Sequence, residues 1–228
     1  MLVTGANKGL GYEAARRFLA AGGHTVYIGA RDPDRGRAAA DSLGARFVQL
    51  DVTSDNSVAS AAEVIDDEQG HLDVLVNNAG ITGPVCDIRD YDGVAMATVL
   101  ATNVVGYVRT IHAFLPLLER SSDPRIVNVS SGLGSFGLAH DESRIESRAP
   151  SPLYAASKSA INMLTARYAQ ALPGIRINAA DPGLTATDLS AGHGHSVVDG
   201  ADPIVTFALA GPETPTGAYR DRDGDLPW

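Results

Sequence analysis

The stretch TGANKGLG at residues 4–11 follows a short apolar run and opens a helical pattern. Its glycines, spaced G-x-x-x-G-x-G, allow the chain to turn tightly from a strand into a helix. They also let the backbone approach a bound pyrophosphate, which the free N–H groups and partial positive charge of a helix start would attract. The spacing differs from G-x-G-x-x-G, so a tight turn without a ligand stays open as the alternative.

Around that turn, short apolar runs alternate with longer helical patterns. We expect strands over 2–3, 25–28, 47–50, 74–76, 126–129 and 176–179, and helices over 10–21, 34–43, 55–69, 92–119 and 153–171. This alternation predicts a single α/β domain over residues 1–228, with a Rossmann-like doubly wound parallel sheet and helices on both faces. Loops are expected over 139–152 and near 188–202. The first strand is unusually short, so we expect either a clipped strand or a start further upstream.

Composition narrows the class of protein. The chain has 228 residues, 44% hydrophobic and 20% charged, which is typical of a globular domain. A net charge of −9 disfavours a nucleic-acid partner. No long apolar run or basic-then-apolar leader is evident, and Cys86 is the single cysteine. We therefore expect a cytoplasmic protein without a membrane partner.

The end of the second expected strand bears on the choice of dinucleotide. In VYIGARDPDR, residues 26–35, Ala30 stands where an NAD-binding acid is often found. Arg31 follows it, and Arg35 comes one helical turn later. Guanidinium groups there can pair with a 2′-phosphate, and Lys8 adds positive charge on the same side. This favours NADP(H) over NAD(H); the alternatives are surface arginines, or Asp32 binding a ribose hydroxyl.

A second group of residues has the chemistry of a general acid. Tyr154 and Lys158 stand at i and i+4 on an expected helix, so they share one face. An ammonium beside the hydroxyl is expected to lower the pKa of Tyr154 and to suit it to acid/base catalysis. Ser131 follows the strand expected over 126–129, where its hydroxyl could hold a carbonyl oxygen. The alternatives are a chance helical pair and a capping serine.

Together these motifs resemble the short-chain dehydrogenase/reductase family. The run GARDPDRG at 29–36 and the Asn-Lys pair in the glycine turn are similar to its NADPH-dependent carbonyl reductase branch. The matching residues occur in family order, and they are Thr4–Gly11, Asp51-Val52, Asn77–Gly80, Asn103, Ser131, Tyr154, Lys158, Asn178, Pro182-Gly183 and Thr187. The resemblance implies hydride transfer from NADP(H) to a ketone or aldehyde, or oxidation of the matching alcohol. The alternative is a non-catalytic regulator that senses NADP(H).

The resemblance also implies a role for each residue. Ser131 and Tyr154 would hold the carbonyl oxygen, and Tyr154 would donate the proton. Lys158 and a water anchored by Asn103 would restore that proton, which completes a catalytic set of four. The residues implied to contact the cofactor are Gly5, Asn7, Lys8, Gly9, Leu10, Gly11, Arg31, Arg35, Asp51, Val52, Asn78, Ala79, Gly80, Tyr154, Lys158, Pro182, Gly183, Thr185 and Thr187.

The chain departs from the family pattern in one place. Ser131 and Tyr154 are further apart than is usual, and the excess is the charged stretch 139–152. Some carbonyl reductases of the family carry a longer insertion at this place and are monomers, whereas usual members form dimers and tetramers, so a monomer and a homo-oligomer both stay open. The stretch 188–202 occupies the position of the family's substrate lid. Its two histidines, His193 and His195, lack a supporting set of ligands, so no metal is expected.

Overall fold

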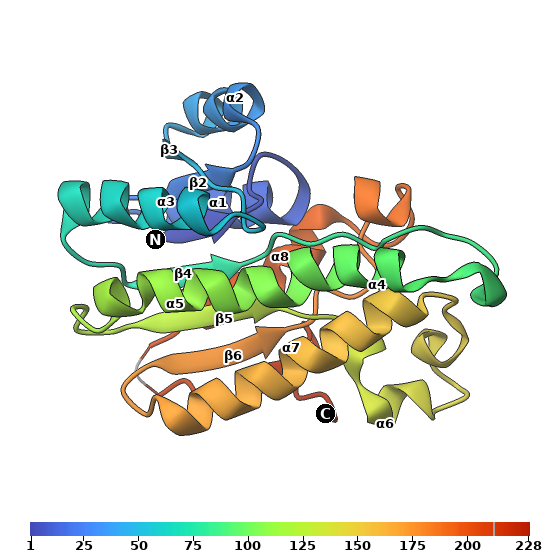
Figure 1. The fold of residues 1–228 in the computed structure, drawn as a ribbon. Helices are drawn as coiled ribbons and strands as arrows, with labels where there is room; N and C mark the ends of the chain where they lie inside the picture. The colour runs from blue at the N-terminus through green and yellow to red at the C-terminus, as the bar shows by residue number, and fades with distance from the viewer. Residues whose placement is uncertain (212) are drawn as a thin grey trace.

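A computed structural model describes residues 1–211 and 213–228, and within them the chain forms one seven-stranded sheet with helices on both faces (Figure 1). All neighbouring strands are parallel, in the order β3-β2-β1-β4-β5-β6-β7. The strands are β1 (Leu2–Thr4), β2 (Tyr27–Ala30), β3 (Arg46–Gln49), β4 (Val74–Asn77), β5 (Arg125–Val129), β6 (Arg176–Ala180) and β7 (Tyr219–Arg220). The helices are α1 (Gly9–Ala21), α2 (Pro33–Leu43), α3 (Asp55–Gln69), α4 (Gly93–Leu100), α5 (Gly106–Leu118), α6 (Phe136–Ala139), α7 (Pro152–Ala171) and α8 (Val197–Leu209). The expected doubly wound α/β fold is confirmed.

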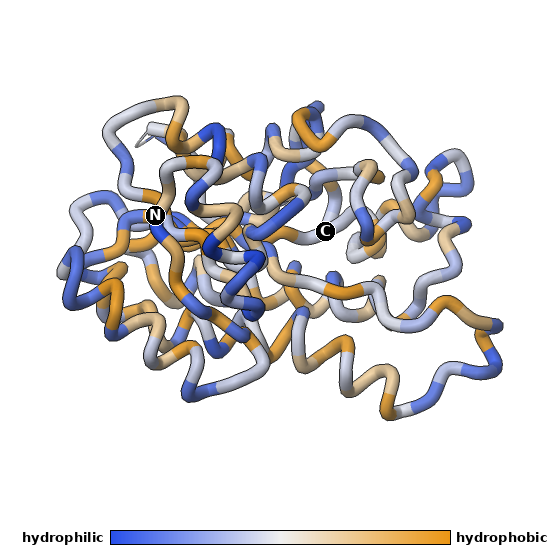
Figure 2. Tube along the Cα trace, turned by 90° about the horizontal axis from the view of Figure 1, so that it is seen from above, coloured by the Kyte–Doolittle hydropathy of each residue, from blue (hydrophilic) through white to orange (hydrophobic). Residues whose placement is uncertain are grey.

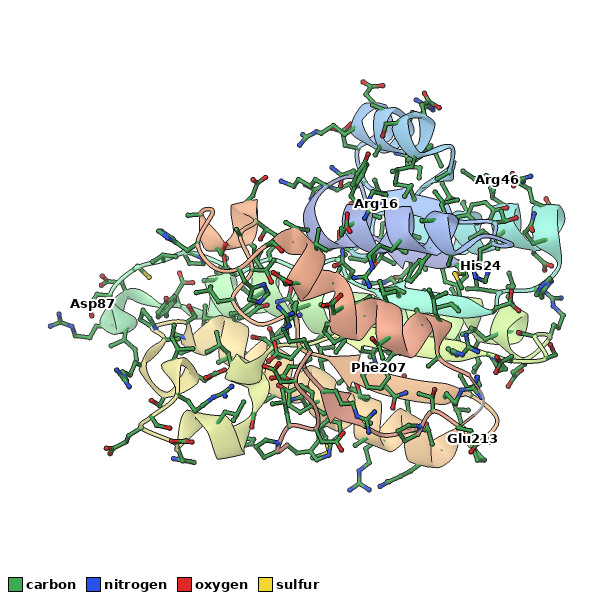
Figure 3. All side chains as sticks on the ribbon, turned by 180° about the vertical axis from the view of Figure 1, so that it is seen from behind. Arg16, His24, Arg46, Asp87, Phe207 and Glu213 are labelled. Carbon is green, nitrogen blue, oxygen red and sulfur yellow. The ribbon has the colours of Figure 1, made fainter. Side chains whose placement is uncertain are left out.

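The helices form two layers, and each layer closes a hydrophobic core against the sheet. Helices α3, α5 and α7 cover the face that is turned to the viewer in Figure 1. Helices α1, α2 and α8 cover the other face, where Figure 3 labels Phe207 on α8. Neighbouring residues of a strand point to opposite faces, so Leu2 joins the first core and Val3 the second. Hydrophilic stretches lie mostly on outer turns and loops (Figure 2).

The position of β1 creates the crevice in which the expected site lies. Strand β1 pairs with β2 on one side and β4 on the other, so the chain order reverses there. Ligands of open α/β sheets bind at the carboxyl ends of strands at such a point. The three-residue strand is reinforced at this end, because the Thr4 hydroxyl accepts hydrogen bonds from the backbone N–H groups of Asn78 (2.9 Å) and Ala79 (3.0 Å).

Several expected elements need correction. The second strand is Tyr27–Ala30 rather than 25–28, because its pairing with β1 begins at Leu2 and Tyr27. The single helix expected over 92–119 is divided into α4, a π-helical turn at Ala101–Val105, and α5. The stretch 139–152 contains a 3₁₀ turn, η4, at Ile145–Arg148.

Helix α8 was not expected from the sequence. A loop was expected over 188–202, but α8 begins inside this stretch, at Val197. The Ser196 hydroxyl caps the helix by accepting from the backbone N–H of Asp199 at 3.1 Å. Small residues and the internal Pro203 weaken the helical pattern there. Apolar residues at helical spacing, such as Ile204 and Ala208, were the signal that could have revealed the helix, and both are buried in the structure.

Within the stretch Gly93–Leu118, a window of 18 residues has a mean hydropathy of 1.4, so by length and composition alone this stretch could cross a membrane. Polar residues such as Asn103 and Arg109 interrupt it, so it is not one continuous apolar run. In the structure, α5 buries Tyr107 and Phe114 under the sheet, with Phe114 in the core shared with α3. Apolar side chains of this stretch therefore pack against the sheet, where α5 is part of the helical layer that covers it.

Candidate active site

Strand β5 and helix α7 bring three expected catalytic residues together. Ser131 follows the carboxyl end of β5, and α7 crosses that part of the sheet with Tyr154 in its first turn (Figure 1). The Ser131 side chain lies beside the Tyr154 hydroxyl and lowers its pKa. Lys158 is only 2% exposed, and its Nζ donates to the Val129 carbonyl at 2.6 Å. The same Nζ lies 5.3 Å from the centroid of the Tyr154 ring.

Burial has the largest effect on the pKa values of Lys158 and Tyr154. It lowers the pKa of Lys158 to about 8, against the attraction of Asp181. It also raises the pKa of Tyr154 well above its usual value; Asp181 raises this pKa further, and the Ser131 side chain lowers it. The expected lowering of the Tyr154 pKa is therefore wrong for this structure, because burial and the Asp181 charge disfavour the phenolate and the Ser131 side chain only partly offsets them. Tyr154 holds its proton firmly.

Asn103 ties the turn after β4 to helix α7. It is fully buried in the π-helical turn, a distortion that is frequent at functional sites. Its amide donates to the Ile81 carbonyl and to the Ser157 hydroxyl, both at 2.9 Å, and its oxygen accepts from the Ile81 N–H at 2.8 Å. Ser157 in turn donates to the Tyr154 carbonyl at 2.6 Å. The side chain thus holds α7 in place.

The glycine turn forms a cradle that fits a pyrophosphate. Helix α1 begins at Gly9 with no side-chain cap and no acidic residue in its first turn, whereas α2, α3, α4 and α8 each begin with a capping side chain. Its first N–H groups are thus left for another acceptor. The turn also lies tightly against the segment after β4: a Cβ on Gly11 would come within 2.6 Å of the Asn78 amide nitrogen.

Two of the three expected basic groups at the adenosine end are engaged within the protein. The Nζ of Lys8 pairs with the Asp188 carboxylate at 2.5 Å. The Nε of Arg35 pairs with Asp32 at 2.9 Å, and Asp32 also caps α2. Among the described residues, no ion pair involves Arg31, which is exposed at the end of β2. The structure therefore leaves Arg31 as the cation available there.

Nearby, Asp51 and Val52 are held by hydrogen bonds within the protein. One Asp51 oxygen accepts from the N–H (2.9 Å) and hydroxyl (2.7 Å) of Thr53. The Val52 carbonyl accepts from the guanidinium of Arg109 at 2.7 Å.

The segment after β6 closes the other end of the crevice. Thr185 is buried, and its hydroxyl donates to the Pro182 carbonyl at 2.9 Å. Thr187 lies beside the glycine turn, since a Cβ on Gly9 would be 3.6 Å from its methyl group. The backbone of His195 makes two hydrogen bonds with this segment: its N–H donates to the Leu184 carbonyl, and its carbonyl accepts from the Ala186 N–H. Within residues 1–211 and 213–228, no group of His, Cys, Asp or Glu side chains is arranged to hold a metal.

Sequence reasoning missed two residues of this region. Asp181 is a buried carboxylate at the end of β6, and burial raises its pKa to about 6. An acid placed directly after an apolar strand and before a Pro-Gly turn was the available signal. Tyr219 on β7 donates from its hydroxyl to the Ser131 carbonyl at 2.7 Å. No local pattern indicates that contact, because it joins segments far apart in the chain.

This fold and this set of side chains define an oxidoreductase of the doubly wound α/β class. A family model described as short chain dehydrogenase matches residues 1–196, and the chain belongs to that family. A short-chain dehydrogenase of Penicillium roqueforti is 36% identical over 243 residues, covering 99% of this chain and 95% of that protein.

Two solved structures show the same fold with different cofactors. The NADPH-bound carbonyl reductase from chicken fatty liver has a TM-score of 0.86 and 26% identity, covering 100% of this chain and 98% of that chain. A 3-ketoacyl-(acyl-carrier-protein) reductase from Brucella melitensis complexed with NADH has a TM-score of 0.85 and 25% identity, covering 96% and 94%.

Proposed function

We propose that the protein reduces a ketone or aldehyde with NADP(H), or oxidises the matching alcohol. The observation that carries the proposal is the buried ammonium of Lys158 beside the Tyr154 ring, with Ser131 close enough to act on the Tyr154 hydroxyl. This group lies at the carboxyl edge of the sheet that also carries the uncapped start of α1. When bound, the reduced nicotinamide supplies the hydride to the carbonyl carbon.

The side chains of this chain supply the binding and the proton. Ser131 and Tyr154 hold the carbonyl oxygen through their hydroxyls, and Tyr154 donates its proton as negative charge develops there. Lys158 keeps positive charge beside the tyrosine and, with a water near Asn103, returns the proton. The glycine turn holds the pyrophosphate, and Pro182 to Thr187 border the nicotinamide.

The proposed preference for NADP(H) rests on Arg31. Its guanidinium is exposed and makes no ion pair with a described residue, whereas Arg35 is held by Asp32. Arg31→Ala should lower kcat/KM for NADPH by about tenfold or more, since a charge-assisted hydrogen bond is lost. The value for NADH should stay within about twofold. Arg37→Ala removes another exposed arginine, on α2, that is not expected to contact the cofactor; it is the matched control and should change neither value strongly. Equal losses with both cofactors in Arg31→Ala would contradict the preference.

The direct test is consumption of NADPH with a panel of aldehydes, ketones, quinones and keto-esters. Turnover of any of them supports the reductase, and tight NADPH binding without turnover favours the alternative, an NADP(H)-sensing regulator. A cytoplasmic setting, without nucleic-acid or membrane partners, belongs to the same proposal. Gel filtration distinguishes a monomer from a homo-oligomer.

A further inference from the structure

Asp181 connects the two turns that frame the candidate active site. Asp181 directly follows β6, and it is only 3% exposed. One carboxylate oxygen, Oδ1, accepts from the backbone N–H of Gly183 at 2.9 Å, and the other, Oδ2, lies so close to Gly132 that a Cβ there would be 3.0 Å from it. Gly132 directly follows Ser131, and Gly183 belongs to the turn proposed to border the nicotinamide. One side chain therefore sets the spacing of both turns.

The inserted stretch covers this carboxylate from outside. A Cβ on Gly132 would lie 2.7 Å from a Glu146 oxygen and 3.0 Å from an Asp181 oxygen, so both carboxylates approach the same glycine. Glu146 belongs to η4 and is paired with Arg144 at 3.0 Å.

Other charged and titratable groups face Asp181 from the surrounding elements. Asp221, just after β7, and Glu146 repel its negative charge. Arg144 is attracted to Asp181. The charge of Asp181 also raises the pKa of Tyr219. From α7, Tyr154 and Lys158 both respond to Asp181. Asp181 is thus a buried anion placed between repelling carboxylates and the catalytic pair.

A carboxylate in such a place is costly to ionise, because burial removes it from water. At neutral pH it is nevertheless ionised, since its pKa is about 6. The attraction of this charge opposes the loss of the Lys158 proton that burial promotes. The charge of Asp181 also raises the pKa of Tyr154. Asp181 itself takes no part in the proposed hydride transfer.

We propose that Asp181 is a positioning residue, which joins the Ser131–Gly132 turn to the Pro182–Gly183 turn and keeps protons on Tyr154 and Lys158 at neutral pH. The catalytic meaning of this inference rests on the proposed function, in which that pair delivers a proton to the substrate. The charge coupling itself does not depend on any substrate.

The test uses the fact that the chain has only two lysines, Lys8 and Lys158. Protein labelled with carbon-13 at lysine Cε gives two NMR signals, and Lys8→Arg assigns them. In the wild type, the Lys158 signal should titrate near the pKa of about 8. In Asp181→Asn it should titrate lower by on the order of one pH unit, because a unit charge has been removed from the protein interior.

Asp221→Asn is the matched control, since it removes a nearby charge that acts on Asp181 but not directly on Lys158. It should leave the Lys158 midpoint at its wild-type value. Asp181→Glu keeps the negative charge, so its Lys158 midpoint should lie close to that of the wild type. An unchanged Lys158 midpoint in folded Asp181→Asn overturns the proposal. If that variant does not fold, the wild-type Lys158 signal decides: an inflection near pH 6, where Asp181 titrates, is expected, and its absence overturns the coupling.

A kinetic readout separates this inference from the proposed function. In an active enzyme, Asp181→Asn should shift the pH profile of kcat/KM in the same direction as the Lys158 signal, which a purely structural role would not do. An unshifted profile overturns the positioning role. A wild type with no turnover but with the expected NMR shift overturns the proposed function and supports the charge coupling.

Discussion

Replacement of Asn103 by alanine should destabilise the protein strongly, although this residue is expected on family grounds to serve catalysis. Its side chain is fully buried and makes three hydrogen bonds within the protein, two to the backbone of Ile81 and one to the Ser157 hydroxyl. Asn103→Ala removes all three. It also releases the turn after β4 from α7, whose residue Ser157 bonds to the Tyr154 carbonyl.

The size of the effect follows from those contacts. Each hydrogen bond contributes about 1 kcal/mol net, so we expect a loss of about 3 kcal/mol in the free energy of unfolding. That is a large part of the roughly 5–15 kcal/mol that stabilises a typical domain. With a urea slope of about 2–3 kcal/mol per molar, the unfolding midpoint should fall by roughly 1–1.5 M.

Urea titration followed by circular dichroism measures this change. Asn162→Ala is the matched control, because Asn162 is also buried but accepts one hydrogen bond, from the Ser130 hydroxyl at 2.5 Å. It should cost about 1 kcal/mol. A loss below about 1 kcal/mol in Asn103→Ala would refute the reasoning, since the amide would then not hold the two segments together.

Two further predictions concern the acid groups of the site. Tyr154→Phe should lower turnover by about a hundredfold or more, because the proton donor is lost, while NADPH affinity by fluorescence titration stays near wild type; retained turnover would remove Tyr154 from the acid role. Asp181 has a raised pKa, about 6 against an ordinary 3.8, so the folded state loses stability as pH rises from about 4 to 6. Asp181→Asn lacks this loss, and its stability relative to wild type should rise by about 2 kcal/mol between roughly pH 4.5 and pH 7.5; a constant difference in urea titrations would contradict the raised pKa.

Much of the candidate site could be predicted because its motifs are local. The turn TGANKGLG, the Tyr154 and Lys158 pair and the serine after β5 each lie within a few residues of the strand or helix that positions them. Their order along the chain, with the rule that parallel strands end at one edge, is enough to bring them together. Helix α8 was missed because Pro203 and small residues weaken its local pattern.

Local sequence was thus sufficient for the doubly wound sheet and for the identity of the proposed catalytic pair, because apolar periodicity and motif spacing act over short distances. The protonation and pairing of those residues depended on the folded molecule. Lys8 meets Asp188 across 180 positions of the chain, and Asp181 acts on Tyr154 and Lys158 through space. A pKa depends on burial and on charges that come from distant segments, so the raised pKa of Tyr154 and the role proposed for Asp181 emerge only when β5, β6 and α7 are packed together.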